Sequence, residues 1–158
     1  ITGEKEFHHG LDMSDSGANY ENYPIYSIAN GIVVYVDKSN TSTCGGNKVY
    51  IQHYINGQFY TSGYWHLRAV TVEKHQVVTK NTQIGVMGGY RGSEYWDECS
   101  TGAHLHLELS DEPFNVENGG SESIWGLRDG FLHPEYYINF PNKGVYWSDR
   151  TTKYSNSY

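Results

Sequence analysis

The segment that decides the fold runs from Thr101 to Leu109 and reads TGAHLHLEL. Successive side chains of a β-strand point to opposite faces, so its leucines would share one face and His104, His106 and Glu108 the other. A helix would not group them in this way, because residues two apart on a helix do not face each other. Imidazole is the commonest metal ligand and often transfers protons near neutral pH. The segment therefore predicts a strand that buries leucines and presents two imidazoles to one small volume.

The composition around this strand favours one domain of mainly β structure. The chain has 158 residues, 18 glycines and 15 tyrosines, with few long apolar runs, which is typical of many short strands and turns. Asn-Gly pairs at Asn30 and Asn56 predict hairpins. A short helical turn is expected from Pro134 to Tyr137. The expected strands are Ile25–Ile28, Gly31–Val36, Lys48–Ile55, Phe59–Leu67, Val70–Val78 and Thr82–Gly88.

Charge and hydropathy exclude several classes of partner. The formal net charge of −7 argues against nucleic acid, which needs a basic patch, and against simple electrostatic attachment to an anionic membrane or wall. No apolar run reaches the roughly 18 residues that a membrane span needs, so no membrane insertion is expected. The segment beginning at Ile1 lacks the apolar core of a signal peptide. Either such a peptide has been removed, or the chain is a domain of a longer protein.

The two cysteines, Cys44 and Cys99, leave three interpretations open. They form a disulfide, remain buried thiols, or bind a metal. Both lie in loops rich in Gly, Ser or Thr, and a single pair without CxxC spacing is a weak zinc motif. A Cys44–Cys99 disulfide is the favoured interpretation, and it would place the protein in an oxidising, extracellular setting.

A metal site is indicated near the N-terminus. By strand alternation His8, Gly10 and Asp12 share a face, and Gly10 leaves a gap in which an imidazole and a carboxylate can converge on one ion. The alternative is a surface histidine followed by a turn aspartate. Catalytic zinc sites use three protein ligands and keep one open position. His8, Asp12 and either His104 or His106 satisfy that number, and spacing does not decide between the last two.

Three further histidines have different contexts. His66 lies in an aromatic, strand-forming segment, where it is either a core histidine or a partner of the imidazole left off the metal. His53 lies beside a predicted turn and is expected to be structural or exposed. His75 lies in a charged stretch and is expected to be solvated. Glu108 is expected either to orient a histidine or to face solvent.

Three motifs occur in the same order as in one known family. They are His8-x-Gly10-x-Asp12, then Tyr64-Trp65-His66-Leu67, then the segment from Ser100 to Glu108. Together they resemble the lysostaphin-type (LytM-like) zinc metalloendopeptidases, over about residues 7–109. The resemblance implies a single catalytic domain of antiparallel sheets, residues 1–158, with an active-site groove, long loops and little helix. Residues 110–158 would be a C-terminal extension packing on that core.

The resemblance also implies site residues and a function. His8, Asp12 and His106 match the zinc ligands, and His66 and His104 match the two catalytic histidines. The implied activity is hydrolysis of peptide bonds in bacterial peptidoglycan, in a cross-bridge or stem peptide, by a secreted or wall-associated monomer. The acidic charge suggests that a targeting module lies elsewhere in the full-length protein. Two alternatives stay open: a catalytically silent relative that binds peptidoglycan or a partner, and a peptidase acting on Gly-rich extracellular proteins.

Overall fold

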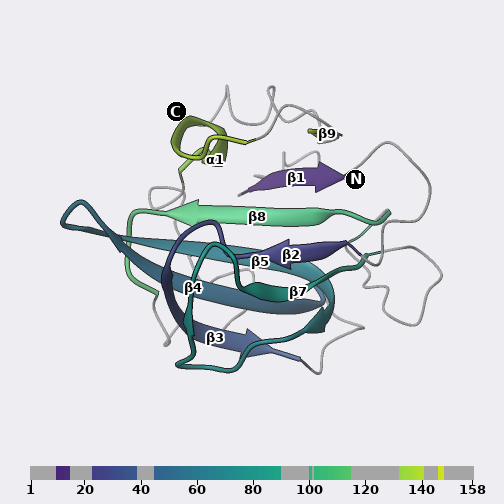
Figure 1. Ribbon diagram of the computed structural model, residues 1–158. Helices are drawn as coiled ribbons and strands as arrows, with labels where there is room; N and C mark the ends of the chain where they lie inside the picture. The colour runs from purple at the N-terminus through teal and green to yellow at the C-terminus, as the bar shows by residue number, and fades with distance from the viewer. Residues whose placement is uncertain are drawn as a thin grey trace, which may run out of the picture.

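The computed structural model describes residues 10–14, 23–38, 45–89, 100, 102–114, 132–140 and 146–147, the last pair as backbone only. Its strands belong to one antiparallel sheet with the order β6-β3-β4-β5-β8-β1-β9, to which β7 joins on β5 and β2 joins on β7 (Figure 1). The mainly β, single-domain fold expected from the sequence is confirmed. The elements are β1 (Leu11–Ser14), β2 (Pro24–Tyr26), β3 (Gly31–Asp37), β4 (Asn47–Ile55), β5 (Gln58–Val70), β6 (Val77–Val78), β7 (Gln83–Met87), β8 (Leu105–Ser110), α1 (Pro134–Tyr137) and β9 (Tyr146–Trp147).

The hairpin predicted at Asn56 is confirmed. Asn56 and Gly57 both have positive φ angles, 51° and 81°, and they join β4 to β5 with Ile55 opposite Gln58. A two-residue turn with both residues left-handed matches the twist of the strands that it connects. Figure 1 shows this hairpin extending past the other strands on one side. These two long strands, β4 and β5, form the central part of the sheet on which the site is built.

The hairpin predicted at Asn30 is wrong. β2 pairs with β7, whereas β3 pairs with β4 and β6. Contacts from distant strands hold the connecting segment: the carbonyl of Asn30 contacts His53 Nδ1 at 2.8 Å, and the Ile28 N–H donates to the Tyr64 hydroxyl at 2.9 Å. Gly31 serves close packing instead of a turn, since a Cβ there would lie 2.5 Å from the carbonyl oxygen of Gln52.

The strand expected over Val70–Val78 is also shorter than predicted. Val70 ends β5, and only Val77 and Val78 form β6. Between them the chain turns, with the Gln76 N–H donating to the carbonyl of Glu73 and with His75 at a φ of 72°. His75 is exposed, as expected from its charged surroundings.

The main core lies between β2 and β7 and the inner face of the longer strands. All six residues of β8 are buried, so its polar face is covered as well as its leucine face. The helical turn predicted at Pro134 is confirmed, with proline in its first turn. Among the described residues, no helix has the length and apolar character to cross a membrane. The buried members of the core are Ile25, Val33, Val49, Ile51, Tyr64, Leu67, Val72, Val78, Ile84, Met87, Leu105 and Leu107.

Candidate functional site

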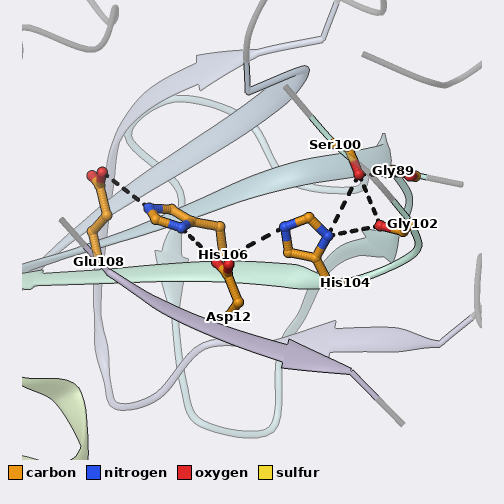
Figure 2. A network of polar contacts seen from close by, with 7 residues as sticks. All are labelled: Asp12, Gly89, Ser100, Gly102, His104, His106 and Glu108. Carbon is orange, nitrogen blue, oxygen red and sulfur yellow. Dashed lines mark hydrogen bonds and ion pairs between the residues drawn. The ribbon is translucent and has the colours of Figure 1, made fainter. Parts of the chain in front are cut away.

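Asp12 and His106 meet because β1 pairs with β8. They are opposite each other in the register, and Asp12 Oδ1 lies 2.8 Å from His106 Nδ1 (Figure 2). Gly10 lies behind the ring: a Cβ there would be 2.6 Å from His106 Nε2. Real Cβ contacts are essentially never that short, so the imidazole of His106 requires the space at Gly10. The predicted convergence of His8 and Asp12 at this gap stays a prediction, because His8 lies outside the described residues. The pair offers one oxygen and one nitrogen to the same point, a donor set suited to zinc.

His104 lies next to this pair and its hydrogen bonds define its usable nitrogen. Its Nδ1 is 2.7 Å from the carbonyl oxygen of Gly102, which only accepts, so the neutral imidazole carries its proton on Nδ1 and its lone pair on Nε2. Nε2 lies 3.8 Å from Asp12 Oδ1, and Figure 2 shows the carboxylate between the two rings. Ser100 supports this arrangement, with its hydroxyl 2.6 Å from the carbonyl of Gly89 and 2.8 Å from that of Gly102.

His66 reaches the same site through a bulge in β5. Asn47 pairs with Leu67 and Val49 with Tyr64, so two residues of β5 oppose one of β4 at this point. His66 has a φ of 61°, and its N–H donates to Gly45 while its carbonyl accepts from Gly88, both at 2.8 Å.

The bulge decides which way His66 points. Tyr64 and Leu67 both pack in the main core, although strict alternation would put them on opposite faces. The extra residue turns His66 to the face of His104, with ring centroids 4.4 Å apart. Left-handed non-glycine residues are strained and concentrate at functional sites, which agrees with a working role for His66.

Behind His106 lies a buried acid. Glu108 is 2% exposed; its Oε1 is 3.4 Å from His106 Nε2, and its Oε2 accepts a hydrogen bond of 2.9 Å from the Tyr50 hydroxyl. Of the two sequence alternatives for Glu108, orientation of a histidine therefore agrees with the structure and solvent exposure does not. The two carboxylates also govern the charge of the ring. Burial alone lowers the pKa of His106, but hydrogen bonds to Asp12 and Glu108 and their negative charges outweigh it and raise the pKa to about 9.

The raised pKa bears on metal binding. In the metal-free protein, two acids hold a proton on His106, so the site already favours positive charge. A divalent cation beside Asp12 would replace that proton. Asp12 and His106 fit two positions of a zinc site, and the expected third ligand, His8, lies outside the described residues. Within the described part of the chain, no group of three His, Cys, Asp or Glu residues gathers around one point.

Other candidates lie away from the site or outside the described chain. His53 is 1% exposed, with its ring nitrogens 2.8 Å from the Asn30 carbonyl and from the Ser62 hydroxyl, so it is structural and not exposed. Cys44 and Cys99 lie outside the described residues, so their pairing stays a prediction.

Sequence reasoning missed Tyr50 and Trp65 as neighbours of the site. Trp65 packs against His106 with ring centroids 5.3 Å apart, and its Nε1–H donates to the Tyr50 hydroxyl at 2.6 Å. A signal was present, since a tyrosine and a tryptophan in strongly strand-forming segments need hydrogen-bond partners once buried. Identifying those partners required the register of three strands.

Comparisons with known proteins identify the family of this chain. The model of Peptidase family M23 matches residues 6–118, more than half of the chain. The chain is 30% identical over 132 residues to Peptidoglycan DD-endopeptidase ShyC of Vibrio cholerae, covering 80% of this chain and 26% of that protein. It is 35% identical over 86 residues to Peptidoglycan DD-endopeptidase ShyA of the same organism, covering 54% of this chain and 17% of that protein. The chain thus spans about a quarter or less of the curated relatives that it matches.

Solved structures give the same fold. The catalytic domain of lysostaphin from Staphylococcus simulans superposes with a TM-score of 0.56 at 24% identity, covering 82% of this chain and 77% of that one. The structure of LytU gives a TM-score of 0.54 at 24% identity, over 82% and 71% of the two chains. With the family model covering all three sequence motifs, the chain belongs to peptidase family M23, the lysostaphin-type family.

Proposed function

We propose that the protein is a zinc-dependent endopeptidase that hydrolyses peptide bonds in bacterial peptidoglycan. The observation that carries this proposal is the convergence of four side chains, three from strands β1, β5 and β8 and one from the isolated bridge that His104 forms with Gly88. Asp12 and His106 meet at 2.8 Å, and the rings of His66 and His104 lie 4.4 Å apart beside them. The two Vibrio cholerae relatives are named as peptidoglycan endopeptidases, which supports peptidoglycan as the substrate.

In this proposal His8, Asp12 and His106 hold the metal. The Nδ1 of His106 and the Oδ1 of Asp12 are the ligand atoms that face each other. When bound, zinc would supply a Lewis acid that polarises the scissile carbonyl and eases deprotonation of water. The rest of the chemistry falls to the protein's own groups.

Proton transfer is assigned to His104 and charge stabilisation to His66. With its Nδ1–H engaged by Gly102, His104 presents the lone pair of Nε2 toward Asp12, which suits it to take a proton from the attacking water and pass it to the leaving amine. His66, fixed by its bulge, would donate a ring N–H to the carbonyl oxygen as negative charge develops there. Peptidoglycan lies outside the cytoplasmic membrane, so we propose that the protein is secreted or wall-associated. We also propose that it acts as a monomer.

The test measures metal and activity separately. Purified protein should contain about one zinc per chain and release new amino groups from purified peptidoglycan, and it should stop doing so in chelator. His106→Ala should lose both metal and activity, whereas His66→Ala and His104→Ala should keep the metal. Tight zinc binding by His106→Ala would contradict the ligand assignment. Binding to peptidoglycan without amine release would instead favour a silent relative. Faster amine release from a Gly-rich protein would favour a peptidase that acts on Gly-rich extracellular proteins.

A further inference from the structure

A chain of buried polar groups crosses the sheet behind His106. Trp65 Nε1–H, from β5, donates to the hydroxyl of Tyr50 on β4 at 2.6 Å, and that hydroxyl donates to Glu108 Oε2 on β8 at 2.9 Å. The other oxygen of Glu108 lies 3.4 Å from His106 Nε2. All four side chains are buried, with Tyr50 at 0% exposure. The proposed catalytic steps do not use Trp65, Tyr50 or Glu108.

The pairing of β4, β5 and β8 leaves room at Gly63 for this row of hydrogen-bonded side chains. Tyr50, Gly63 and Glu108 lie side by side across β4, β5 and β8. A Cβ on Gly63 would lie 2.5 Å from the ring of Tyr50 and 3.0 Å from Glu108 Oε2. Only a residue without a side chain lets Tyr50 reach over β5 to Glu108.

The direction of the hydrogen bonds follows from which groups can donate. An indole N–H only donates, so the Tyr50 oxygen accepts from Trp65 and its own proton is available to Glu108. An ionised carboxylate only accepts, so Glu108 Oε1 needs a proton on His106 Nε2. The hydrogen bonds therefore run in one direction, from Trp65 through Tyr50 to Glu108, and they place a proton on Nε2 of His106.

We propose that Glu108 is a positioning residue that keeps the proton of His106 on Nε2 and leaves Nδ1 for the metal, with Tyr50 and Trp65 fixing the direction of its hydrogen bonds. This inference rests on the proposed function, in which His106 is a ligand. In the other tautomer the proton on Nδ1 would donate to Asp12 Oδ1, 2.8 Å away. That hydrogen bond would occupy both ligand atoms at once.

Glu108→Gln tests the proposal because the amide changes the direction of one hydrogen bond while keeping the shape of the side chain. The Tyr50 proton favours the amide oxygen on its own side, which turns the NH2 group toward His106 Nε2. Nε2 must then accept, and the proton moves to Nδ1. We expect the zinc Kd, measured by chelator competition, to rise by about 10- to 100-fold.

A double variant separates direction from simple damage. In Tyr50→Phe/Glu108→Gln the phenol proton is gone, so the amide can turn its oxygen to His106. We expect the double variant to bind zinc more tightly than Glu108→Gln, although Tyr50→Phe alone weakens binding. Ser62→Ala is the matched control, since it removes a buried hydroxyl from β5 that contacts His53 and Tyr64. It should lower stability and leave zinc affinity unchanged.

The outcomes distinguish this inference from the proposed function. A wild-type protein that binds no zinc refutes both. A wild-type protein that binds zinc, with an unchanged zinc Kd in Glu108→Gln, refutes only the role of Glu108. Weaker binding by the double variant than by Glu108→Gln refutes the assigned direction. If Glu108→Gln does not fold, Tyr50→Phe decides, since an unchanged Kd there overturns the proposal.

Discussion

Gly10 shows how much of the site depends on an absent side chain. It contributes no functional group, yet His106 can occupy its position only because nothing projects from Gly10. The backbone there also approaches the carbonyl of Leu107, at 2.7 Å from where a Cβ would lie, so neither the ring nor the strand has room to yield. Overpacking of this kind forces side chains away from their preferred rotamers and shifts the backbone, at a cost of about 1–3 kcal/mol.

Gly10→Ala should therefore displace the His106 ring and weaken zinc binding. We expect the zinc Kd to rise by about 10- to 100-fold, as it does when a group that orients a metal ligand is lost. Chelator competition measures the change. Gly57→Asn is the control, because a Cβ at Gly57 meets nothing and asparagine tolerates the left-handed backbone of that turn. Unaltered zinc affinity in Gly10→Ala would contradict the packing of His106 against Gly10.

His104→Ala should keep zinc and lose activity, because the side chain assigned to proton transfer is removed while the ligands stay. Removal of a general base costs about 10²- to 10⁴-fold in rate. Amine release from purified peptidoglycan and metal content measured on the same sample check the two parts. His75→Asn is a suitable control, since this exposed histidine lies in a turn away from the site. Equal losses in the two variants would count against the role of His104.

At the scale of elements, β5 contributes most to the site. Its regular part places Gly63 and Trp65 beside β8, and its bulge turns His66 to the same face. A left-handed conformation costs a non-glycine residue about 1–2 kcal/mol. The hydrogen bonds of the His66 backbone to Gly45 and Gly88 hold His66 in this conformation and must offset that cost. The strand thus gives up stability at the position where chemistry is proposed.

His66→Gly and His66→Ala should separate strain from function. Both lose the imidazole and should lose activity, but glycine adopts a φ of 61° without strain. After the entropy that glycine loses on folding, His66→Gly should be more stable than His66→Ala by about 0.5–1 kcal/mol. Urea unfolding of both variants in chelator measures this difference. If His66→Gly is instead less stable than His66→Ala by about 0.5–1 kcal/mol, the bulge carries no strain at His66.

The same strands show how far the sequence predicts this protein. Alternation correctly predicts β8, and the Asn56-Gly57 turn correctly predicts the β4–β5 hairpin. The Asn30-Gly31 turn is mispredicted because Tyr64 and His53 hold that segment from other strands. The bulge at His66 was unpredictable for a similar reason, since its left-handed backbone is imposed by Gly45 and Gly88 and has no local signal.

At the scale of the whole molecule, buried His53 links stability to pH. Burial lowers its pKa, with the hydrogen bond to Asn30 opposing that shift only in part. The unfolded chain, with a histidine pKa near 6.5, therefore binds a proton that the folded protein refuses. Between the unfolded and folded pKa values, stability falls as pH falls.

We expect His53→Gln to remove this part of the pH dependence. Free energies of unfolding measured in urea at pH 7 and pH 5, in chelator, should differ less for the variant than for the wild type. The variant should be less stable than the wild type at pH 7, where neutral His53 keeps both its contacts. An identical pH dependence in the two proteins would show that His53 is not the group responsible.

Asp12 and His106 are separated by 94 positions in the chain, yet they meet at hydrogen-bond distance. In the proposed zinc-loaded state, an ion held by both would act as a reversible crosslink that closes a loop of more than half of the 158-residue chain. Closing long loops restricts the unfolded chain most, and a ligand at 100 times its Kd stabilises the folded state by about 2.7 kcal/mol. Chelation should then loosen β1 first, so that proteases gain access to the N-terminal strand while the β4–β5 hairpin stays protected. The availability of zinc would thereby set the lifetime of the protein as well as its activity.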